Sequence, residues 1–175
     1  MTTPFDLALE GFQLGESETF VRLDGLESFM RAQQLLVNQA RRELFIVTPD
    51  FEPERYNEPA FADALSAFVR RSRFSDARIL LGDPTIAVRW GHKVVTLGRR
   101  LTSKLSIRQL HEEDARAMEA WMVVDDIGLL RREGREGFTG ALFSRAIPHA
   151  QRARREFLEM WDRSSEIPDF RQLHL

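Results

Sequence analysis

Short apolar runs alternate along the chain with longer stretches in which apolar residues recur at helical spacing. The runs predict strands over residues 18–23, 44–48, 77–81, 104–110, 121–124 and 127–130. The helical spacing predicts helices over residues 26–42, 59–73, 84–101 and 148–163. The last two apolar runs are either two strands joined at Asp125-Asp126 or one long strand with a bulge. This order, β-α-β-α-β-α-β-β-α, predicts an α/β fold whose mixed sheet is flanked by helices on both faces.

Polar residues, prolines and glycines mark the boundaries of these elements. Three of the helices follow polar residues that suit an N-cap, namely Asp24, Asn57 and Asp83. Residues 50–59 and 111–116 are rich in charge and are expected to form loops. A turn and an irregular sheet edge are expected at Gly134, Gly137 and Gly140.

The length of 175 residues suits one domain, and 43% of the residues are apolar, enough for a sizeable core. Residues 1–17 are expected to form an irregular lead-in and residues 18–175 a single domain, whose tail from residue 167 packs back onto the body. The chain has no Cys, which excludes disulfides, cysteine-ligated zinc and thiolate catalysis. No apolar run is long enough to span a bilayer and no signal pattern opens the chain, so a cytoplasmic protein without a membrane partner is expected.

The charge is unevenly distributed. The 25 basic residues are 23 Arg and two Lys, Lys93 and Lys104, and the formal net charge is −2. Residues 61–110 nevertheless hold ten basic and three acidic residues, a net charge of +7, between acidic flanks. This basic segment is either neutralised inside the fold or forms an anion-binding surface, since Arg pairs with carboxylates and phosphates alike. A net charge so close to zero argues against a nucleic-acid partner.

One face of the predicted helix 84–101 carries several polar candidates. The spacing brings together on that face His92, Thr96, Arg99 and Ser103, with Lys93 and Arg100 beside them. A separate apolar stripe consists of Ile86, Trp90, Val94, Leu97 and Leu101. The polar face is either a site for a phosphate or carboxylate or the solvated side of an amphipathic helix.

Three further polar candidates lie on strands or at strand ends, namely Asp83, Arg108 and Asp125. Ligands of α/β sheets bind near the carboxyl ends of strands, so one cleft is expected to hold all three, unless they form a buried Arg–Asp pair. The full candidate anion site comprises His92, Lys93, Arg100, Ser103, Arg108 and Asp125. No metal site is expected, because the Arg-rich surroundings disfavour Mg²⁺ at the Asp residues. No cofactor is expected, and no residue is assigned a catalytic role.

The element order together with residues 121–126 (WMVVDD) resembles one half of the phospholipase D-like superfamily. That resemblance implies an H-x-K-x-x-x-x-D motif, with a His nucleophile, a Lys that binds phosphate, and two halves that build one site. When Asp125 is placed on the family Asp, Met118 stands at the His position and Ala120 at the Lys position. Arg132 and Glu133 stand where the family has Gly and Ser. The resemblance therefore implies a degenerate half that has lost its chemistry and that forms a homodimer.

A closer resemblance is to a bacterial phospholipase D-like domain of unknown function that sometimes adjoins an N-acetyltransferase domain. The similar stretches are Gly91–Lys93, Leu101–Ser103, Ile107-Arg108, Val124-Asp125, Phe157–Trp161 and Leu173–Leu175. The expected function is a non-catalytic module that binds a phosphate-bearing or other anionic ligand, or a protein partner. The alternatives are a phosphodiesterase or nuclease with a rearranged site that uses His92 and Lys93, and a regulatory partner of an N-acetyltransferase.

Overall fold

A computed structural model describes residues 8–16 and 20–171 of the chain. Its strands are β1 (Phe20–Asp24), β2 (Glu43–Thr48), β3 (Asp76–Leu81), β4 (Leu105–Gln109), β5 (Trp121–Val124), β6 (Gly128–Arg132), β7 (Thr139–Phe143) and β8 (Ser165–Glu166). Its helices are α2 (Leu26–Gln39), α3 (Pro53–Tyr56), α4 (Pro59–Arg71), α5 (Thr85–Trp90), α6 (Lys93–Arg100), α7 (Glu112–Ala117) and α8 (Ile147–Arg163). A short 3-10 helix, Pro168–Phe170, follows β8.

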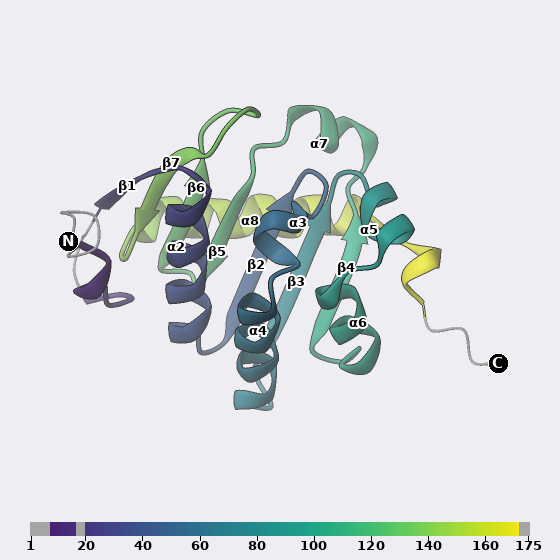
Figure 1. Cartoon of the computed structure of the whole chain (residues 1–175), viewed down its shortest axis with the longest axis horizontal. Helices are drawn as coiled ribbons and strands as arrows, with labels where there is room; N and C mark the ends of the chain where they lie inside the picture. Colours follow the sequence, from purple (N-terminus) through teal and green to yellow (C-terminus); the bar gives the residue numbers. More distant parts are fainter. Residues whose placement is uncertain (1–7, 17–19, 172–175) are drawn as a thin grey trace.

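The strands form one mixed sheet in the order β1-β7-β6-β5-β2-β3-β4-β8. Helices α2, α4 and α6 lie on one face of this sheet, and α8 crosses the other face (Figure 1). The predicted α/β class, with a mixed sheet and helices on both faces, is confirmed. In the part of the chain that the structure describes, no helix is both long and apolar enough to cross a membrane.

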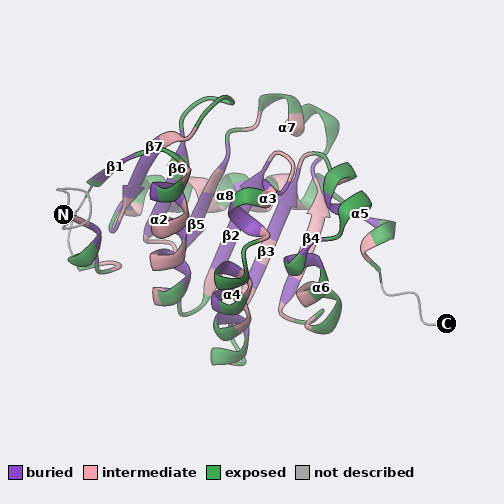
Figure 2. Ribbon diagram, in the orientation of Figure 1, coloured by how far each residue is buried: buried purple, intermediate pink, exposed green. Residues whose placement is uncertain are grey.

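The alternation of side chains along β2 divides the core into two layers. Leu44 and Ile46 belong to the layer under α2 and α4, whereas Phe45 and Val47 belong to the layer under α8. Phe45 stacks on Phe157 of α8, with the ring centroids 4.5 Å apart. Figure 2 shows the resulting band of buried residues along the central strands. Every residue of β2 after Glu43 is buried, which confirms the buried strand that the apolar run over 44–48 predicted.

Strands β2, β3 and β4 are parallel, so their carboxyl ends meet at one edge of the sheet, which we call the upper edge. Helices α3, α5 and α7 lie along that edge (Figure 1). The amino ends of the same strands meet at the opposite edge, the lower edge. Strand β5 is antiparallel to β2, so the turn at Asp125-Asp126 lies at the lower edge, where the Asp125 N–H donates to the carbonyl of Glu43.

The single helix predicted over residues 84–101 is wrong. The structure has two helices, α5 and α6, because Gly91 takes a φ of 76° and turns the chain between them. The predicted apolar stripe fails with it, since Ile86 and Trp90 are exposed, Trp90 to 78%. Pro84, not the predicted Asp83, directly precedes α5, but the Asp83 carboxylate accepts the N–H and the hydroxyl of Thr85, the first residue of that helix. These two hydrogen bonds lower the pKa of Asp83.

Two segments expected as loops contain helices. Residues 111–116 include most of α7, and the His111 ring accepts the N–H of Glu113 at its start. Residues 50–59 contain α3, which begins with a proline. Both helices are a turn or two long, so their sequences give too few repeats for the helical period to stand out.

The predicted N-caps Asp24 and Asn57 are wrong. Asp24 ends β1, and Gly25 precedes α2. Glu58, not Asn57, precedes α4, while Asn57 Oδ1 accepts the N–H of Lys93 at the start of α6.

The turn predicted at the glycines is confirmed, because Gly134 and Gly137 lie in the loop before β7 and both have a φ of 70°. The predicted irregular edge is wrong at Gly140, which lies in β7, a regular strand between β1 and β6. A Cβ on Gly140 would lie 2.0 Å from the Arg131 carbonyl oxygen and 2.8 Å from the Phe29 ring, so glycine here allows close packing inside the sheet.

Both ends of the described chain pack on the body. Leu9 and Phe12, within the expected lead-in, are buried in the core. The tail packs back as predicted, because Ile167 is buried and the Arg99 guanidinium binds the carbonyl of Phe170 at 3.0 Å. The first two residues of the strand predicted from residue 18, and the motif Leu173–Leu175, lie outside the described residues.

Candidate functional site

The resemblance places the lost catalytic positions at the upper edge. A cavity of about 270 Å³ lies there, and Met118 and Ala120 are both in its wall. Its lining consists of Pro49, Gly82, Asp83, Ala115, Met118, Ala120, Arg132, Gly134 and Arg135. Neither His nor Lys belongs to this lining, and a thioether and a methyl group cannot attack a phosphodiester or bind its charge.

A network of buried charges adjoins this cavity. The Glu52 carboxylate pairs with Arg132 and, at 2.8 Å, with Arg55, and all three side chains are less than 10% exposed. Arg55 also donates to Gln33 Oε1 at 3.2 Å, and Arg132 to the carbonyl of Gly137 at 2.8 Å. The guanidinium of Arg132 therefore donates its hydrogen bonds to groups of the protein itself. In the alignment on Asp125, the superfamily has Gly at this position.

The neighbour of this network, Tyr56, is fully buried. Burial raises its pKa to about 12, so its hydroxyl stays protonated at physiological pH. The sequence reading missed Glu52, Arg55 and Arg132 as a unit. The spacing of Glu52 and Arg55 at i and i+3 was the available signal, and it was hidden in a segment expected to be a loop.

Asp125 lies away from the upper edge, and within the described part of the chain it pairs with no Arg side chain. It and Asp126 form the β5–β6 turn, with φ values of 52° and 64°. The Asp125 carboxylate accepts the backbone N–H groups of Arg41, Arg42 and Glu43 at 2.8, 2.8 and 2.9 Å. The turn settles the open question in favour of two strands. The expected cleft that would join Asp125 with Asp83 and Arg108 is wrong, because β5 runs antiparallel to β2 and places Asp125 at the lower edge.

His92 is a buried cap, not a surface group on a helix face. Its Nδ1 accepts the N–H of Val94 at 3.2 Å, and its Nε2 lies 3.3 Å from the carbonyl oxygen of Phe51. The ring also stacks on that of Phe51, with centroids 4.1 Å apart. Burial lowers the pKa of His92 to about 4, so the ring is neutral at pH 7. Both ring nitrogens are occupied, which leaves no free atom for an anion or a nucleophilic attack.

The other four predicted site residues lie in three places. Lys93 is exposed next to His92, whereas Arg100, the last residue of α6, and Ser103, in the loop after it, are exposed at the lower edge. Arg108 is on β4, where it donates to the hydroxyl and carbonyl of Ser164 at 2.7 and 2.6 Å. The six-residue strand β2 alone separates the two edges by about 20 Å. The structure therefore does not gather the six predicted residues into one site.

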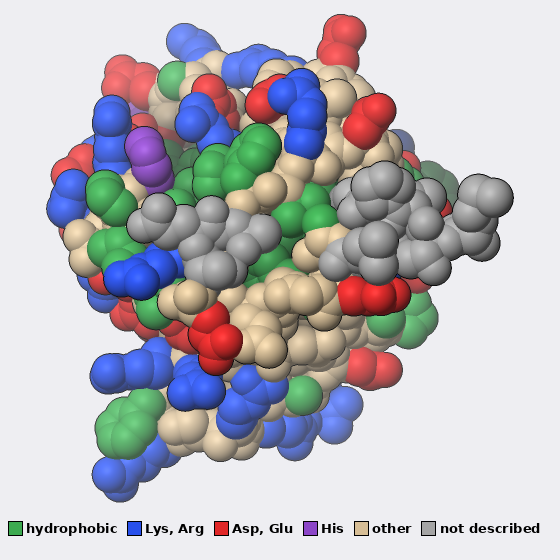
Figure 3. All heavy atoms as spheres, turned by 90° about the vertical axis from the view of Figure 1, so that its left-hand side faces the viewer, with side chains coloured by type: hydrophobic (Ala, Val, Ile, Leu, Met, Phe, Trp, Pro, Cys, Tyr) green, Lys and Arg blue, Asp and Glu red, His purple; other side chains and the backbone are tan. Residues whose placement is uncertain are grey.

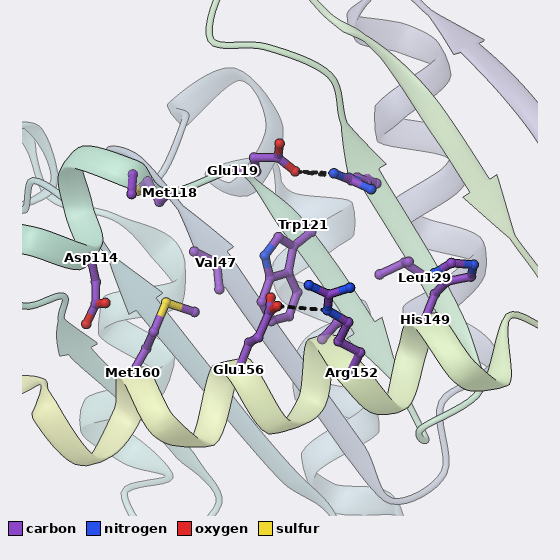
Figure 4. A pocket seen from close by; sticks show the side chains of 13 residues that line it. Val47, Asp114, Met118, Glu119, Trp121, Leu129, His149, Arg152, Glu156 and Met160 are labelled. Carbon is purple, nitrogen blue, oxygen red and sulfur yellow. Dashed lines mark hydrogen bonds and ion pairs between the residues drawn. The ribbon is translucent and has the colours of Figure 1, made fainter.

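The face of the sheet under α8 has a groove of about 430 Å³ (Figure 4). Trp121, Leu129 and Val47 lie along the sheet side of this groove. Its charged side chains are paired with each other or with neighbours: Glu119 with Arg131, Glu156 with Arg152, and Asp114 with Arg163. The groove consequently offers no excess of positive charge to an anion.

The lower edge carries a cluster of cations, which we call the basic edge. It consists of Arg41, Arg42, Arg70, Arg71, Arg73, Arg100 and Lys104. The loops before β2, β3 and β4 bring them together, because Asp76 N–H donates to the carbonyl of Arg42 and Ala77 N–H to that of Lys104. Neighbouring strands are about 4.8 Å apart, so the three loops span about 10 Å. Figure 3 shows Lys and Arg side chains gathered at the lower end of the molecule.

The cations of the basic edge have no carboxylate partner among the described residues. Arg71 donates to backbone carbonyls that include that of Asn38, at 3.1 Å, and Lys104 to the carbonyl of Ser72. Of the ten cations in residues 61–110, only Arg78 has an ion pair within the described chain, with Asp76 at 2.9 Å. Internal neutralisation of the basic segment is therefore not observed in that part of the molecule.

The carboxylates next to the basic edge are engaged elsewhere. Glu43 pairs with Arg154 of α8 at 2.6 Å, and Arg154 also interacts electrostatically with Asp126 and Asp76. The hydrogen bond to Glu43 is the main reason why the pKa of Arg154 is raised, and the neighbouring carboxylates add to the effect. The acidic groups thus face α8, and the exposed surface of the edge remains positive.

A family model described as "Domain of unknown function (DUF7931)" matches residues 25–173. The chain belongs to this family. No curated protein matches the DUF7931 chain.

Solved structures show that the DUF7931 chain has a phospholipase D-like fold. NucT from Helicobacter pylori superposes with a TM-score of 0.66 at 10% identity, over 85% of this chain and 99% of NucT. Nuc from Salmonella typhimurium, a phospholipase D family member, gives 0.61 at 11% identity, over 88% of this chain and 100% of Nuc. TrmBL2, described as an archaeal chromatin protein with a novel mode of DNA binding, gives 0.67 at 13% identity over 87% of this chain. The match covers 54% of TrmBL2, so the chain spans about half the length of that protein.

Proposed function

We propose that this DUF7931 chain is a non-catalytic phospholipase D-like module that binds a phosphate-bearing or other anionic ligand. The lack of catalysis is supported by the cavity at the upper edge, where Met118 and Ala120 stand at the positions of the nucleophile and the phosphate-binding Lys. The one other histidine candidate, His92, has both ring nitrogens engaged. Neither place offers a nucleophile for the attack on phosphorus.

Anion binding rests on one observation, the basic edge. Seven cations lie around three adjacent loops, and the carboxylates nearby are bonded to other groups. Like charges so close together repel one another, and this repulsion is relieved when an anion binds. The planar guanidinium also binds two phosphate oxygens at once, which makes an Arg-rich surface a better phosphate site than a Lys-rich one.

The test combines an activity assay and a binding assay. The wild-type chain is expected to leave bis(p-nitrophenyl) phosphate intact and to bind inorganic tripolyphosphate in calorimetry at low salt. The triple variant Arg41→Gln/Arg42→Gln/Arg73→Gln is expected to bind at least tenfold more weakly, because it removes three positive charges from the basic edge. The variant is expected to fold, since these side chains make no hydrogen bond that the fold needs. Hydrolysis of the phosphodiester, or equal tripolyphosphate affinity in the triple variant, contradicts the proposal.

A matched control removes three other exposed cations, Arg89, Arg145 and Arg155. None of the three has an ion pair within the described residues, and all lie outside the basic edge. Their triple substitution by Gln changes the net charge equally and is expected to leave tripolyphosphate binding unchanged. An equal loss in both triple variants would indicate attraction to the overall charge, without a site.

The homodimer and the N-acetyltransferase partner remain predictions of the family resemblance. Light scattering of the purified chain over a range of concentrations tests the dimer directly. A mass of about 20.3 kDa at every concentration would identify a monomer and remove that prediction.

A further inference from the structure

Phe74 is presented at the tip of the basic edge. It lies in the tight turn between α4 and β3, where its N–H donates to the Ser72 hydroxyl at 3.1 Å and the Ser75 N–H donates to the Ser72 carbonyl at 3.3 Å. The Phe74 side chain is 61% exposed, although phenylalanine is normally buried. The turn thus holds an apolar ring largely in solvent, with the Arg73 guanidinium over it at 4.6 Å from the ring centroid.

The cations surround this ring on a protruding part of the molecule. Arg70 and Arg71 end α4 just before the turn, and Lys104 reaches it from the next loop through a hydrogen bond to the Ser72 carbonyl. Figure 1 shows the end of α4 and the turn after it as the lowest part of the ribbon. A protruding turn with one exposed aromatic ring and several surrounding cations is complementary, in shape and in charge, to a flat anionic surface.

We infer that the basic edge docks the protein on an anionic lipid bilayer, with the Phe74 ring in the interfacial layer and the surrounding arginines on the lipid phosphates. This inference rests on the proposed function and names its ligand. Each Lys or Arg close to such a surface strengthens binding about fivefold. The apolar ring adds burial of apolar surface in the interfacial layer, which charged side chains alone do not provide. Such peripheral binding needs no membrane-spanning helix.

A nucleic acid fits these observations less well. Single-stranded nucleic acid binds along grooves with several aromatic rings for successive bases, and duplex DNA is read by an element that enters a groove of the DNA. The basic edge presents one ring, Phe74, on a short turn. The membrane is therefore the occupant that uses both the charge and the exposed ring.

Vesicle co-sedimentation of the full chain tests the inference. The wild type is expected to bind vesicles of 30% phosphatidylserine in phosphatidylcholine and not vesicles of phosphatidylcholine alone. Phe74→Ala is expected to weaken vesicle binding about tenfold and to leave tripolyphosphate binding unchanged, since the ring serves only the bilayer. Arg41→Gln/Arg42→Gln/Arg73→Gln is expected to weaken vesicle binding about a hundredfold and to weaken tripolyphosphate binding too.

Trp90→Ala is the matched control, because Trp90 is an exposed aromatic residue on α5 at the opposite edge. It is expected to bind vesicles like the wild type, and circular dichroism of each variant checks the fold. Tripolyphosphate binding without vesicle binding, or full vesicle binding by Phe74→Ala, overturns the membrane inference and leaves the proposed function intact. If the wild type binds neither tripolyphosphate nor vesicles, the proposed function and the membrane inference are both overturned. Tighter binding to a 20-nucleotide strand than to vesicles assigns the edge to nucleic acid and overturns the inference.

Discussion

Asp125 Oδ2 accepts a hydrogen bond from the backbone N–H of Arg41 at 2.8 Å and so joins the β5–β6 turn to the loop before β2. The same carboxylate accepts two more backbone N–H groups, those of Arg42 and Glu43. Asp125→Ala removes the acceptor for all three donors, and we expect a loss of about 2–3 kcal/mol in the free energy of unfolding. Urea unfolding followed by circular dichroism measures this loss.

The control for Asp125 is Asp162, which is exposed on α8 and makes no hydrogen bond within the described residues. Asp162→Ala is expected to change stability by less than about 0.5 kcal/mol. If the two variants were equally stable, the three hydrogen bonds of Asp125 would contribute nothing that water cannot replace.

Glu52 holds two buried arginines, Arg55 and Arg132. Glu52→Gln keeps the shape of the side chain but leaves both guanidinium groups without a counter-charge. We expect this variant to lose about 3–5 kcal/mol of stability, because an unpaired buried charge is costly. Thermal and urea unfolding measure the loss, and the exposed Glu54→Gln serves as the control. A stability of Glu52→Gln close to that of Glu54→Gln would show that the network is not desolvated in solution.

The pH dependence of stability should reveal His92. The pKa of this histidine is about 4 in the folded chain and 6.5 for an unperturbed histidine, so between these pH values the unfolded state binds a proton that the folded state does not. The free energy of unfolding therefore falls as the pH drops from 6.5 to 4, by about 3 kcal/mol in total from this group, and is unaffected by it above pH 7.5.

His92→Gln removes this contribution, so its stability should change less than that of the wild type over the same pH range. Urea unfolding at four pH values between 4.5 and 7.5 gives the difference, in which the titration of the carboxylates cancels. The exposed His111→Gln is the control and should follow the wild type. Parallel pH profiles for wild type and His92→Gln would mean that His92 titrates normally in the folded chain.

Gly91 separates α5 from α6 with a φ of 76° and a ψ of 161°, a combination that only glycine adopts without strain. Gly91→Ala is expected to destabilise the chain by about 1–3 kcal/mol through backbone strain alone, since an added Cβ would meet no atom within 4 Å. Gly98→Ala is the opposite case, because Gly98 lies inside α6 and an added Cβ would make only ordinary contacts, with Ile107 at 3.6 Å and with Leu105 at 3.7 and 3.8 Å. Higher helix propensity should stabilise it by up to about 1 kcal/mol. A continuous helix over 84–101 would reverse the result for Gly91.

The hydrophobic pattern of the chain was sufficient for the fold class. Central strands such as β2 and β3 carry runs of buried apolar residues, 44–47 and 79–81, because helices cover both faces of the sheet, and α8 has seventeen residues over which the helical period can be read. The departure from the H-x-K-x-x-x-x-D motif, with Met118 and Ala120 at the His and Lys positions, could also be read from the sequence, because an alignment on Asp125 needs no coordinates. Both results depend on local pattern or residue identity, which the order of residues contains.

Proximity was decided by the tertiary structure alone. The spacing of residues 92–103 implied one helix face, but a positive φ at Gly91 makes His92 the cap of a new helix and buries its ring against Phe51, 41 positions earlier in the chain. That helix, α6, ends at Arg100, before Ser103. The antiparallel direction of β5 placed Asp125 at the edge opposite to the expected cleft. The basic edge likewise joins three loops that are adjacent only because β2, β3 and β4 are parallel. Strand direction and pairing are set by contacts between distant residues, so charges that the sequence counts can be assigned to a surface only in the folded chain.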